Sequence, residues 1–111
     1  INANGVLISW AIENVIKNGI DAVDNNGKIC VKMRKNLKNV VIQIVDSGKG
    51  ISRKDWRNIF RPGFSSKAQG WGLGLSLTSR IIKEIHGGTI RVAKSNIGNG
   101  TTIEITLPQP N

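Results

Sequence analysis

The chain has 111 residues, which is enough for one domain with one hydrophobic core. Sixteen basic and seven acidic residues give a net charge of +9, which suits an anionic partner such as a nucleotide, a nucleic acid or an acidic protein. A single cysteine excludes an internal disulfide, and no apolar run approaches the roughly 18 residues of a membrane-spanning helix. We expect residues 1–111 to form one domain and, because the first residue is Ile1 and not methionine, to be part of a longer protein.

The expected elements begin with a long helix. From Asn4 to Asp24, apolar residues recur three and four positions apart and leave a polar stripe, which predicts one helix with one buried face. The sequence NNG at 25–27 predicts its end. The segments KICVKMR and NVVIQIVD follow, and their alternation and β-branched residues predict an antiparallel pair joined by KNLKN.

A short helix, a loop, a longer helix and a second hairpin complete the order. Ser52 as N-cap and Asp55 three residues later predict a short helix over SRKDWRNIF, and residues 61–72 contain too much Gly, Ser and Pro for regular structure. LGLSLTSRIIKEIHGG has helical spacing and ends at a glycine pair, and the turn NIGNG joins the alternating segments TIRVAKS and TTIEITLP. This order predicts an α+β fold, a two-layer sandwich whose mixed, mostly antiparallel sheet is covered on one face by about three helices.

Polar side chains line one face of the first helix. Asn14, Asn18 and Asp21 are four and three residues apart and therefore project as neighbours, with Lys17 beside them. Asparagine is ordinary on the solvent face of a helix. Three oxygen donors in a line could instead hold Mg²⁺ that also bridges phosphates, and both interpretations stay open on spacing alone.

A second motif, VDSGKGI, places Asp46 at the end of a strand. Gly48 and Gly50 follow closely, so the carboxylate could point into a cleft while the glycines let the backbone approach a flat ligand. The same residues are also ordinary turn residues, and in isolation the turn is the better interpretation.

A third motif, SSKAQGWGLGLS, precedes the longer helix. Gly70, Gly72 and Gly74 expose backbone N–H groups where a helix dipole favours an anion, and Lys67 adds a mobile positive charge. A flexible linker is the alternative, but the residues between the glycines are too apolar for one. The motif therefore predicts a lid that contacts phosphate.

Together the motifs resemble the ATP-binding domain of sensor histidine kinases, in the wider group shared with gyrase, the Hsp90 chaperones and the MutL repair proteins. NVIKNGIDA is similar to the N box of that family, DSGKG to the G1 box, IFRPGFSSK to the F box and GWGLGL to the G2 box. The resemblance runs from Asn4 to Pro108. It implies the Bergerat ATP-binding fold, with ATP and Mg²⁺ as cofactors.

The resemblance also implies roles for single residues. Asn18 would bind magnesium with Asn14 as a second contributor, and Asp46 would accept a hydrogen bond from the adenine amino group. Asn18 and Lys67 are the catalytic candidates, because they act on the phosphates. The full set of nucleotide-binding residues that the resemblance implies is Asn14, Lys17, Asn18, Asp21, Asp46, Gly48, Gly50, Ile51, Phe60, Phe64, Lys67, Gly70, Gly72, Leu73 and Gly74.

The sequence departs from the family pattern at several places. Gly19 stands where the family usually has alanine, which should weaken the helix by roughly 0.5 to 1 kcal/mol. The lid between Phe64 and Gly70 is short. The family's strand before the first helix is absent or reduced to the first few residues, which would expose a sheet edge. His86, the only histidine, matches a structural position at a helix end, so we expect the phosphorylated histidine to lie outside this chain.

One position bears on the choice between kinase and hydrolase. ATP-hydrolysing relatives place a glutamate, the general base, one helical turn before the metal-binding asparagine, and here that place holds Asn14. Glu13 lies about 140° further round an ideal helix from Asn18 and points elsewhere. The sequence therefore favours phosphoryl transfer over hydrolysis.

The family also implies partners. We expect the chain to donate the γ-phosphoryl group of ATP to a histidine on a separate dimerisation domain of the same protein, with a response regulator downstream. We expect a cytoplasmic location, a parent protein that can be membrane-anchored, no nucleic-acid or membrane contact by this segment, and ATP binding without autophosphorylation by the isolated chain. The alternatives are an ATPase, serine-directed kinase or anti-sigma module of the same fold and, less favoured, a basic nucleic-acid-binding domain.

Overall fold

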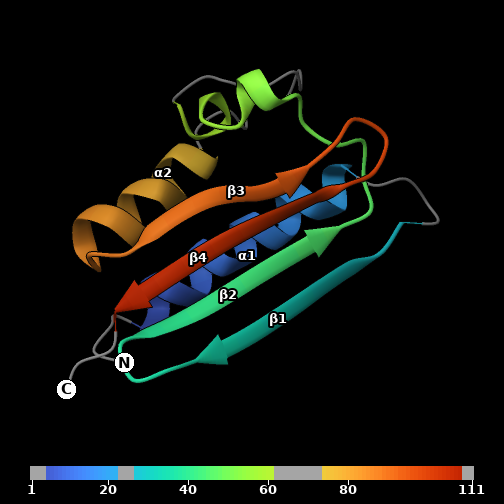
Figure 1. The fold of residues 1–111 in the computed structure, drawn as a ribbon. Coiled ribbons are helices and arrows are strands. Elements are labelled where there is room, and N and C mark those ends of the chain that lie inside the picture. Colours follow the sequence, from blue (N-terminus) through green and yellow to red (C-terminus); the bar gives the residue numbers. More distant parts are fainter. Residues whose placement is uncertain (1–4, 23–26, 62–73, 109–111) are drawn as a thin grey trace.

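In the computed structural model, the chain forms a four-stranded sheet and a layer of helices (Figure 1). The structure describes residues 5–22, 27–61 and 74–108. In chain order the elements are α1 (Gly5–Ala22), β1 (Ile29–Lys35), β2 (Asn39–Asp46), two 3-10 turns η1 (Arg53–Asp55) and η2 (Asn58–Phe60), α2 (Gly74–Arg80), its π-helical continuation η4 (Ile81–Ile85), β3 (Thr89–Ser95) and β4 (Thr101–Pro108). The order of helices and strands is the one that the sequence predicts.

The sheet consists of the two predicted hairpins, joined side by side. Its strand order is β1-β2-β4-β3, and every pair is antiparallel, so no parallel pair of a mixed sheet occurs among the described strands. β2 and β4 form the centre, and their register places Ile44 opposite Ile103 and Asp46 opposite Thr101. The last residue of β2 is thereby fixed against the first residue of β4.

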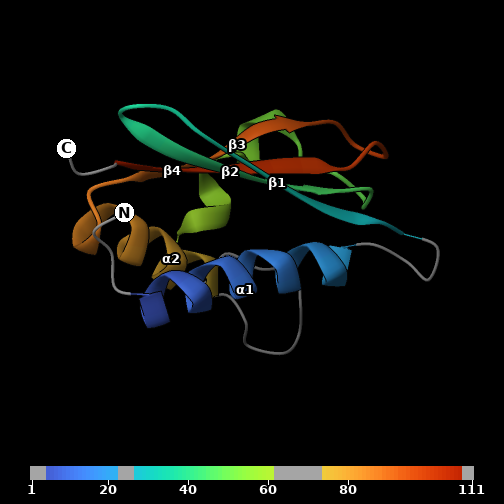
Figure 2. The ribbon, with the colours of Figure 1, turned by 90° about the horizontal axis from the view of Figure 1, so that it is seen from below.

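The hydrophobic core lies between the sheet and the helices, which cover one face of the sheet only (Figure 2). Alternate residues of β2 and β4 point into it, as the period of two in a strand requires. Ala11 and Val15 of α1, Ile105 of β4 and Ile82 of η4 are completely buried there. The apolar stripe predicted for the first helix is therefore the face that packs on the sheet.

The predicted short helix over SRKDWRNIF is wrong in detail, because the segment forms the two 3-10 turns η1 and η2. Ser52 stands at the cap position but makes no side-chain capping hydrogen bond, and Asp55 instead accepts one from Asn58 Nδ2 at 3.2 Å. Trp56 Nε1 donates to the carbonyl oxygen of Ile51 at 3.0 Å. These local bonds hold a segment that is too short to sustain a helix by itself.

The longer predicted helix is confirmed as α2 and η4, although Leu73 and the preceding loop lie outside the described residues. It ends as predicted at Gly87, whose φ of 66° is left-handed. His86 Nδ1 lies 2.9 Å from the carbonyl oxygen of Ile81, so the histidine contacts the end of its own helix. In the described ranges, no helix combines the length and apolar character needed to cross a bilayer.

Candidate nucleotide-binding site

Asp46 is a buried carboxylate at the end of a central strand. Asp46 is only 7% exposed. It lies on the helix side of the sheet because it is two residues from the core residue Ile44 and therefore points to the same face. The N–H of Gly48 donates to Asp46 Oδ1 at 2.8 Å. Burial raises the pKa of Asp46, and hydrogen bonds from the backbone of Gly48 and Thr101 oppose that rise. Since a carboxylate offers about four acceptor sites, Asp46 can still accept an N–H group from a ligand.

The loop that follows Asp46 is braced against the β3–β4 hairpin. Gly50 has a φ of +78°, and a Cβ added there would lie 2.0 Å from the carbonyl oxygen of Asn96. The N–H of Gly98 donates to the carbonyl oxygen of Lys49 at 2.7 Å. Gly50 is thus required by packing within the protein, in addition to any approach of a ligand.

A buried serine ties the same loop to the start of β4. Ser95 Oγ accepts a hydrogen bond from the N–H of Ile51 at 2.7 Å, donates to the carbonyl oxygen of Gly100 at 3.0 Å, and lies 2.8 Å from Thr101 Oγ1. A Cβ on Gly100 would lie 2.1 Å from the carbonyl oxygen of Asp46. The sequence did not predict the supporting role of Ser95, Gly100 and Thr101. The available signal was a serine at the end of one strand and a glycine between the hairpin turn and the next strand.

The C-terminal half of α1 forms the adjoining wall. Gly19 is buried there, and a Cβ added to it would lie 3.4 Å from Asp46 Cβ and 3.5 Å from Asp46 Oδ2. Asn18 is the residue before Gly19, and its side chain is half-buried. Asn18 is thus the neighbour in sequence of the α1 residue that lies against Asp46.

The two asparagines of α1 differ in their contacts. Asn14 Nδ2 donates to the carbonyl oxygen of Trp10, one turn earlier, at 2.9 Å, so the amide nitrogen is engaged within its own helix. No hydrogen bond to the Asn18 side chain occurs within the described part of the chain. Lys17 between them is exposed, and the side chain of Asp21 is outside the described residues.

This donor set fits magnesium bound together with a nucleotide. Amide oxygens from Asn18 and Asn14 are hard ligands, and Mg²⁺ commonly takes most of its ligands from water and substrate phosphates. Among the described residues, no three His, Cys, Asp or Glu side chains form a group that could hold a metal without a nucleotide. The asparagines therefore suit a metal that arrives with its phosphates.

The remaining predicted site residues fall into two groups. Ile51 and Phe60 are half-buried and pack against the core. Gly74 is the first residue of α2. The other lid residues that were predicted lie outside the described residues: Phe64, Lys67, Gly70, Gly72 and Leu73. The structure thus describes the wall formed by α1, the Asp46 loop and the β3–β4 hairpin.

Comparison with known proteins identifies relatives over almost the whole chain. The family model described as histidine kinase-, DNA gyrase B-, and HSP90-like ATPase matches residues 4–111. Sporulation kinase D of Bacillus subtilis is 39% identical over 101 residues, which are 91% of this chain and 20% of the relative. Sensor histidine kinase ZraS of Escherichia coli is 39% identical over 108 residues, 97% of this chain and 23% of the relative. The chain thus spans only a minor part of these relatives.

Solved structures show the same fold. The catalytic domain of histidine kinase ThkA has a TM-score of 0.85 and 34% identity, and the match covers 96% of this chain and 68% of that one. The mycobacterial sensor histidine kinase MprB has a TM-score of 0.86 and 26% identity, with coverage of 97% and 76%. These structures confirm the predicted α+β fold with helices on one face of the sheet.

Proposed function

Because the chain belongs to the family of histidine kinase-, DNA gyrase B- and HSP90-like ATPases, we propose that it is the ATP-binding catalytic domain of a two-component sensor histidine kinase. Its reaction is the transfer of the γ-phosphoryl group of ATP to a histidine side chain. Residues 1–111 form one such domain within a longer protein. The names of its relatives support this proposal, since they are a sporulation kinase and a sensor histidine kinase.

The buried Asp46 carboxylate is the observation that carries the proposal. A carboxylate kept in a buried position has lost most of its hydration, so an incoming N–H donor replaces lost hydrogen bonds at little further cost. The 6-amino group of adenine is such a donor. The loop after Asp46 is held by hydrogen bonds from Gly48 to Asp46 and from Ile51 to Ser95, so the carboxylate is fixed in position before a ligand arrives.

Charge neutralisation and positioning are the catalytic contributions of this domain. Asn18 and Asn14 would hold the metal through their amide oxygens, and Lys67 would add positive charge for the phosphate oxygens. Bound Mg²⁺ supplies positive charge that offsets the charge of the triphosphate. The protein residues thereby orient the γ-phosphoryl group toward the acceptor histidine, which comes from another domain.

Transfer is favoured over hydrolysis by the contacts of α1. Asn14 occupies the turn before Asn18, and its neutral amide has no basic group that could take a proton from water, so it cannot act as a general base. Glu13 is exposed on the helix surface. Turnover of ATP by the isolated domain that Glu13→Ala abolishes would instead identify an ATPase.

The partners follow from the proposed reaction. The acceptor is a dimerisation domain of the same protein, and the phosphoryl group then passes to a response regulator. A solved structure of histidine kinase ThkA in complex with response regulator protein TrrA supports that second partner, since it aligns with this chain at a TM-score of 0.78 and 30% identity. The site of action is the cytoplasm, where ATP is available.

The melting temperature in the presence of ADP tests the proposal, because a ligand that binds the folded state raises it by mass action. We expect a saturable rise that Mg²⁺ enhances. In Asp46→Asn, the side-chain oxygen still accepts the hydrogen bond from the Gly48 N–H. The new NH₂ group then points to the ligand, where it places a donor opposite the adenine donor. Nucleotide affinity should fall roughly 10- to 100-fold, since a mismatched buried donor costs about 1–3 kcal/mol.

Glu13→Gln is the matched control, because it neutralises an exposed carboxylate of α1 and should leave the ADP response unchanged. If ADP at millimolar concentration fails to raise the melting temperature of the unaltered protein, the proposed function is wrong for this chain.

A further inference from the structure

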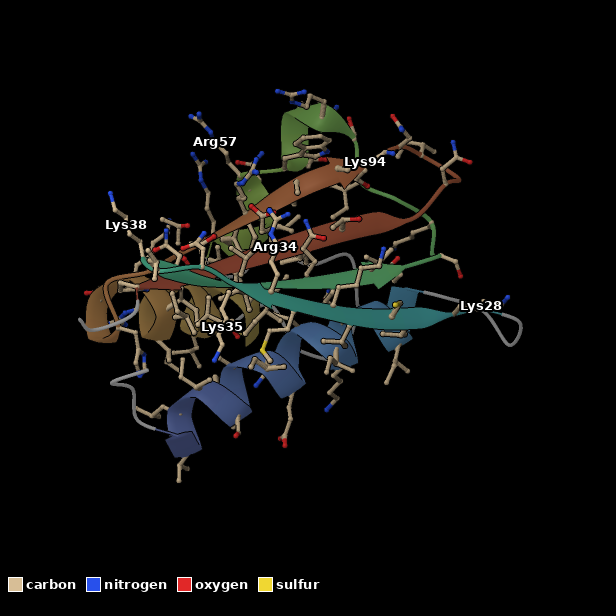
Figure 3. All side chains as sticks on the ribbon, turned by 60° about the horizontal axis from the view of Figure 1, so that its bottom comes forward. Lys28, Arg34, Lys35, Lys38, Arg57 and Lys94 are labelled. Atoms are coloured by element: carbon tan, nitrogen blue, oxygen red, sulfur yellow. The ribbon has the colours of Figure 1, made fainter. Side chains whose placement is uncertain are left out.

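Positive side chains gather on the face of the sheet that points away from the helices, the outer face. Residues paired across two strands point to the same face of a sheet. The outer face therefore carries Lys32 and Arg34 of β1 and Arg91 and Lys94 of β3, whose partners on β2 and β4 point away from the core. Figure 3 shows Arg34 and Lys94 on the side of the sheet away from α1. Since β1 and β3 are the two edges of the sheet, the charges form two rows about 14 Å apart, or three strand spacings.

The strip between the two rows is close to neutral. Valine and threonine residues of β2 and β4 make up most of it. Its one carboxylate, Glu104, accepts hydrogen bonds from Gln43 Nε2 at 2.9 Å and from Arg91 at 3.0 Å, and the pKa of Glu104 is lowered by them. In the described ranges, no ion pair joins Lys32 or Lys94 to an acidic side chain. The outer face therefore has a neutral centre and a positive rim.

A pocket of about 370 Å³ adjoins the Lys94 end of this rim. The guanidinium of Arg53 lies over the ring of Trp56, 4.4 Å from the ring centroid, and the Trp56 hydrogen bond to Ile51 fixes the ring. Ile97, in the hairpin on the other side of the pocket, is 70% exposed. Two cationic groups, an aromatic wall and an exposed aliphatic group thus surround one hollow, which suits a carboxylate on an aliphatic stem such as a glutamate side chain.

We propose that the outer face and this pocket form a docking surface for an acidic protein. The partner carries carboxylates around a neutral or apolar centre, and one of its acidic side chains enters the pocket between Arg53 and Lys94. A charge-depleted centre with a charged rim is the usual anatomy of a protein–protein interface. The outer face lies on the opposite side of the sheet from Asp46, and the pocket joins that face at Lys94.

The distribution of charge favours an acidic protein over a nucleic acid or a membrane. A polyanion that crossed the outer face would lie over its neutral centre, where Glu104 is paired with Arg91 and uncharged side chains offer the anion no positive partner. A protein can instead place its carboxylates only opposite the two cationic rows. Its association should weaken with added salt, because the Debye length is about 8 Å at physiological ionic strength and the rim is exposed.

Two synthetic peptides of equal charge serve as probes, one with its glutamates in two clusters about 14 Å apart around a neutral centre and one with its glutamates evenly spread. Binding is followed by titration calorimetry and by the backbone amide shifts of the protein, and the clustered peptide should bind more tightly. We expect the shifts to concentrate on β1, β3 and the pocket. Lys94→Glu and Arg34→Glu should each weaken binding about fivefold or more, whereas Glu104→Gln should strengthen it severalfold because it removes the one opposing charge. Lys83→Glu is the matched control, since Lys83 is an exposed lysine of η4 on the helix layer and its substitution changes the net charge equally.

An unchanged melting temperature without nucleotide shows that the fold of each variant is intact. Because this readout does not require ADP, the test is separate from that of the proposed function. Equal weakening by Lys83→Glu and Lys94→Glu, or an absence of binding, would overturn the proposal. Tighter binding of double-stranded DNA or of phosphatidylserine vesicles through the same residues would also overturn it and would assign the outer face to that other class of anion.

Discussion

Gly19 of α1 lies directly against Asp46 at the end of β2. A Cβ on Gly19 would be 3.5 Å from Asp46 Oδ2 and 2.9 Å from Ile29 Cδ1. The first distance is an ordinary van der Waals contact, and the second is with the end of a flexible side chain, which can move. α1, which carries Asn18, therefore lies close to the strand that carries the buried carboxylate.

Gly19→Ala should therefore stabilise the protein. Alanine favours a helix over glycine by about 0.5–1 kcal/mol, and only the end of Ile29 must move to admit the methyl group. The free energy of unfolding in urea measures the gain. Gly88→Ala is the contrasting variant, because its Cβ would lie 2.3 Å from the carbonyl oxygen of Thr106, and backbone cannot give way cheaply. A loss of stability in Gly19→Ala would show that Ile29 is held in place.

The raised pKa of Asp46 predicts how stability depends on pH without nucleotide. Because the folded state binds the proton more tightly than the unfolded state, the stabilisation is full below the unfolded pKa, near 3.8, and is lost as the pH rises through the folded pKa. The unfolding free energy of the unaltered protein minus that of Asp46→Asn should thus decrease between acidic and neutral pH. Urea unfolding at several pH values measures this slope. An increase instead would mean that the hydrogen bonds from Gly48 and Thr101 outweigh burial.

Two glycines with the same backbone conformation should respond differently to substitution. Gly50 and Gly98 both have positive φ, +78° and +85°, but a Cβ meets the carbonyl oxygen of Asn96 at Gly50 and open space at Gly98. Gly98→Ala should cost about 1 kcal/mol for the left-handed conformation alone. Gly50→Ala should cost clearly more and should also weaken ADP binding. Equal losses of unfolding free energy would show that the hairpin moves away from the loop at no cost.

Ser95→Ala should destabilise the protein by about 1–3 kcal/mol, because the N–H of Ile51 loses its acceptor in a partly buried position. Ser52→Ala is the matched control. Since the hydroxyl of Ser52 makes no capping bond, its removal should change the unfolding free energy by less than about 0.5 kcal/mol. A large loss of unfolding free energy in Ser52→Ala would instead support the capping role that the sequence predicts for Ser52.

Asn18→Ala should remove the enhancement by Mg²⁺ of the ADP-induced rise in melting temperature. The rise with ADP alone should persist, because Asp46 and its loop are unchanged. Asn14→Ala should have a smaller effect on the same comparison, since its amide nitrogen is committed to Trp10 and only its oxygen is available. If the Mg²⁺ effect survives in Asn18→Ala, the metal is held elsewhere.

The sequence alone predicts those helices and strands whose local signals agree with their packing in the fold. α1, both hairpins and the left-handed end at Gly87 follow from periodicity and turn residues, and the structure confirms them. The segment from Ser52 to Phe60 was predicted as one helix because its N-terminal residues fit a capping box. Its actual form depends on a bond from Trp56 to Ile51 and on burial of Ile59, which no local pattern reveals.

The site shows the same division. Asp46 and its glycines stand in a recognisable motif, so they could be identified as a group. Ser95 and Gly100 support that motif from far along the chain, and their role appears only when β4 pairs with β2. Spacing in a sequence indicates what lies along one helix or one loop. It does not indicate which distant residue supplies a hydrogen bond.

The pairing of β2 with β4 has a consequence for synthesis of the protein. On the ribosome, β2 pairs first with β1, and its other edge stays unpaired until residues 101–108 have been added, several seconds later at about 5–20 residues per second. During that interval an apolar, β-branched strand has an open edge, which is a hazard for aggregation. The loop of Asp46 also lacks its braces until then. The proposed nucleotide site is therefore complete only after β4 has been added.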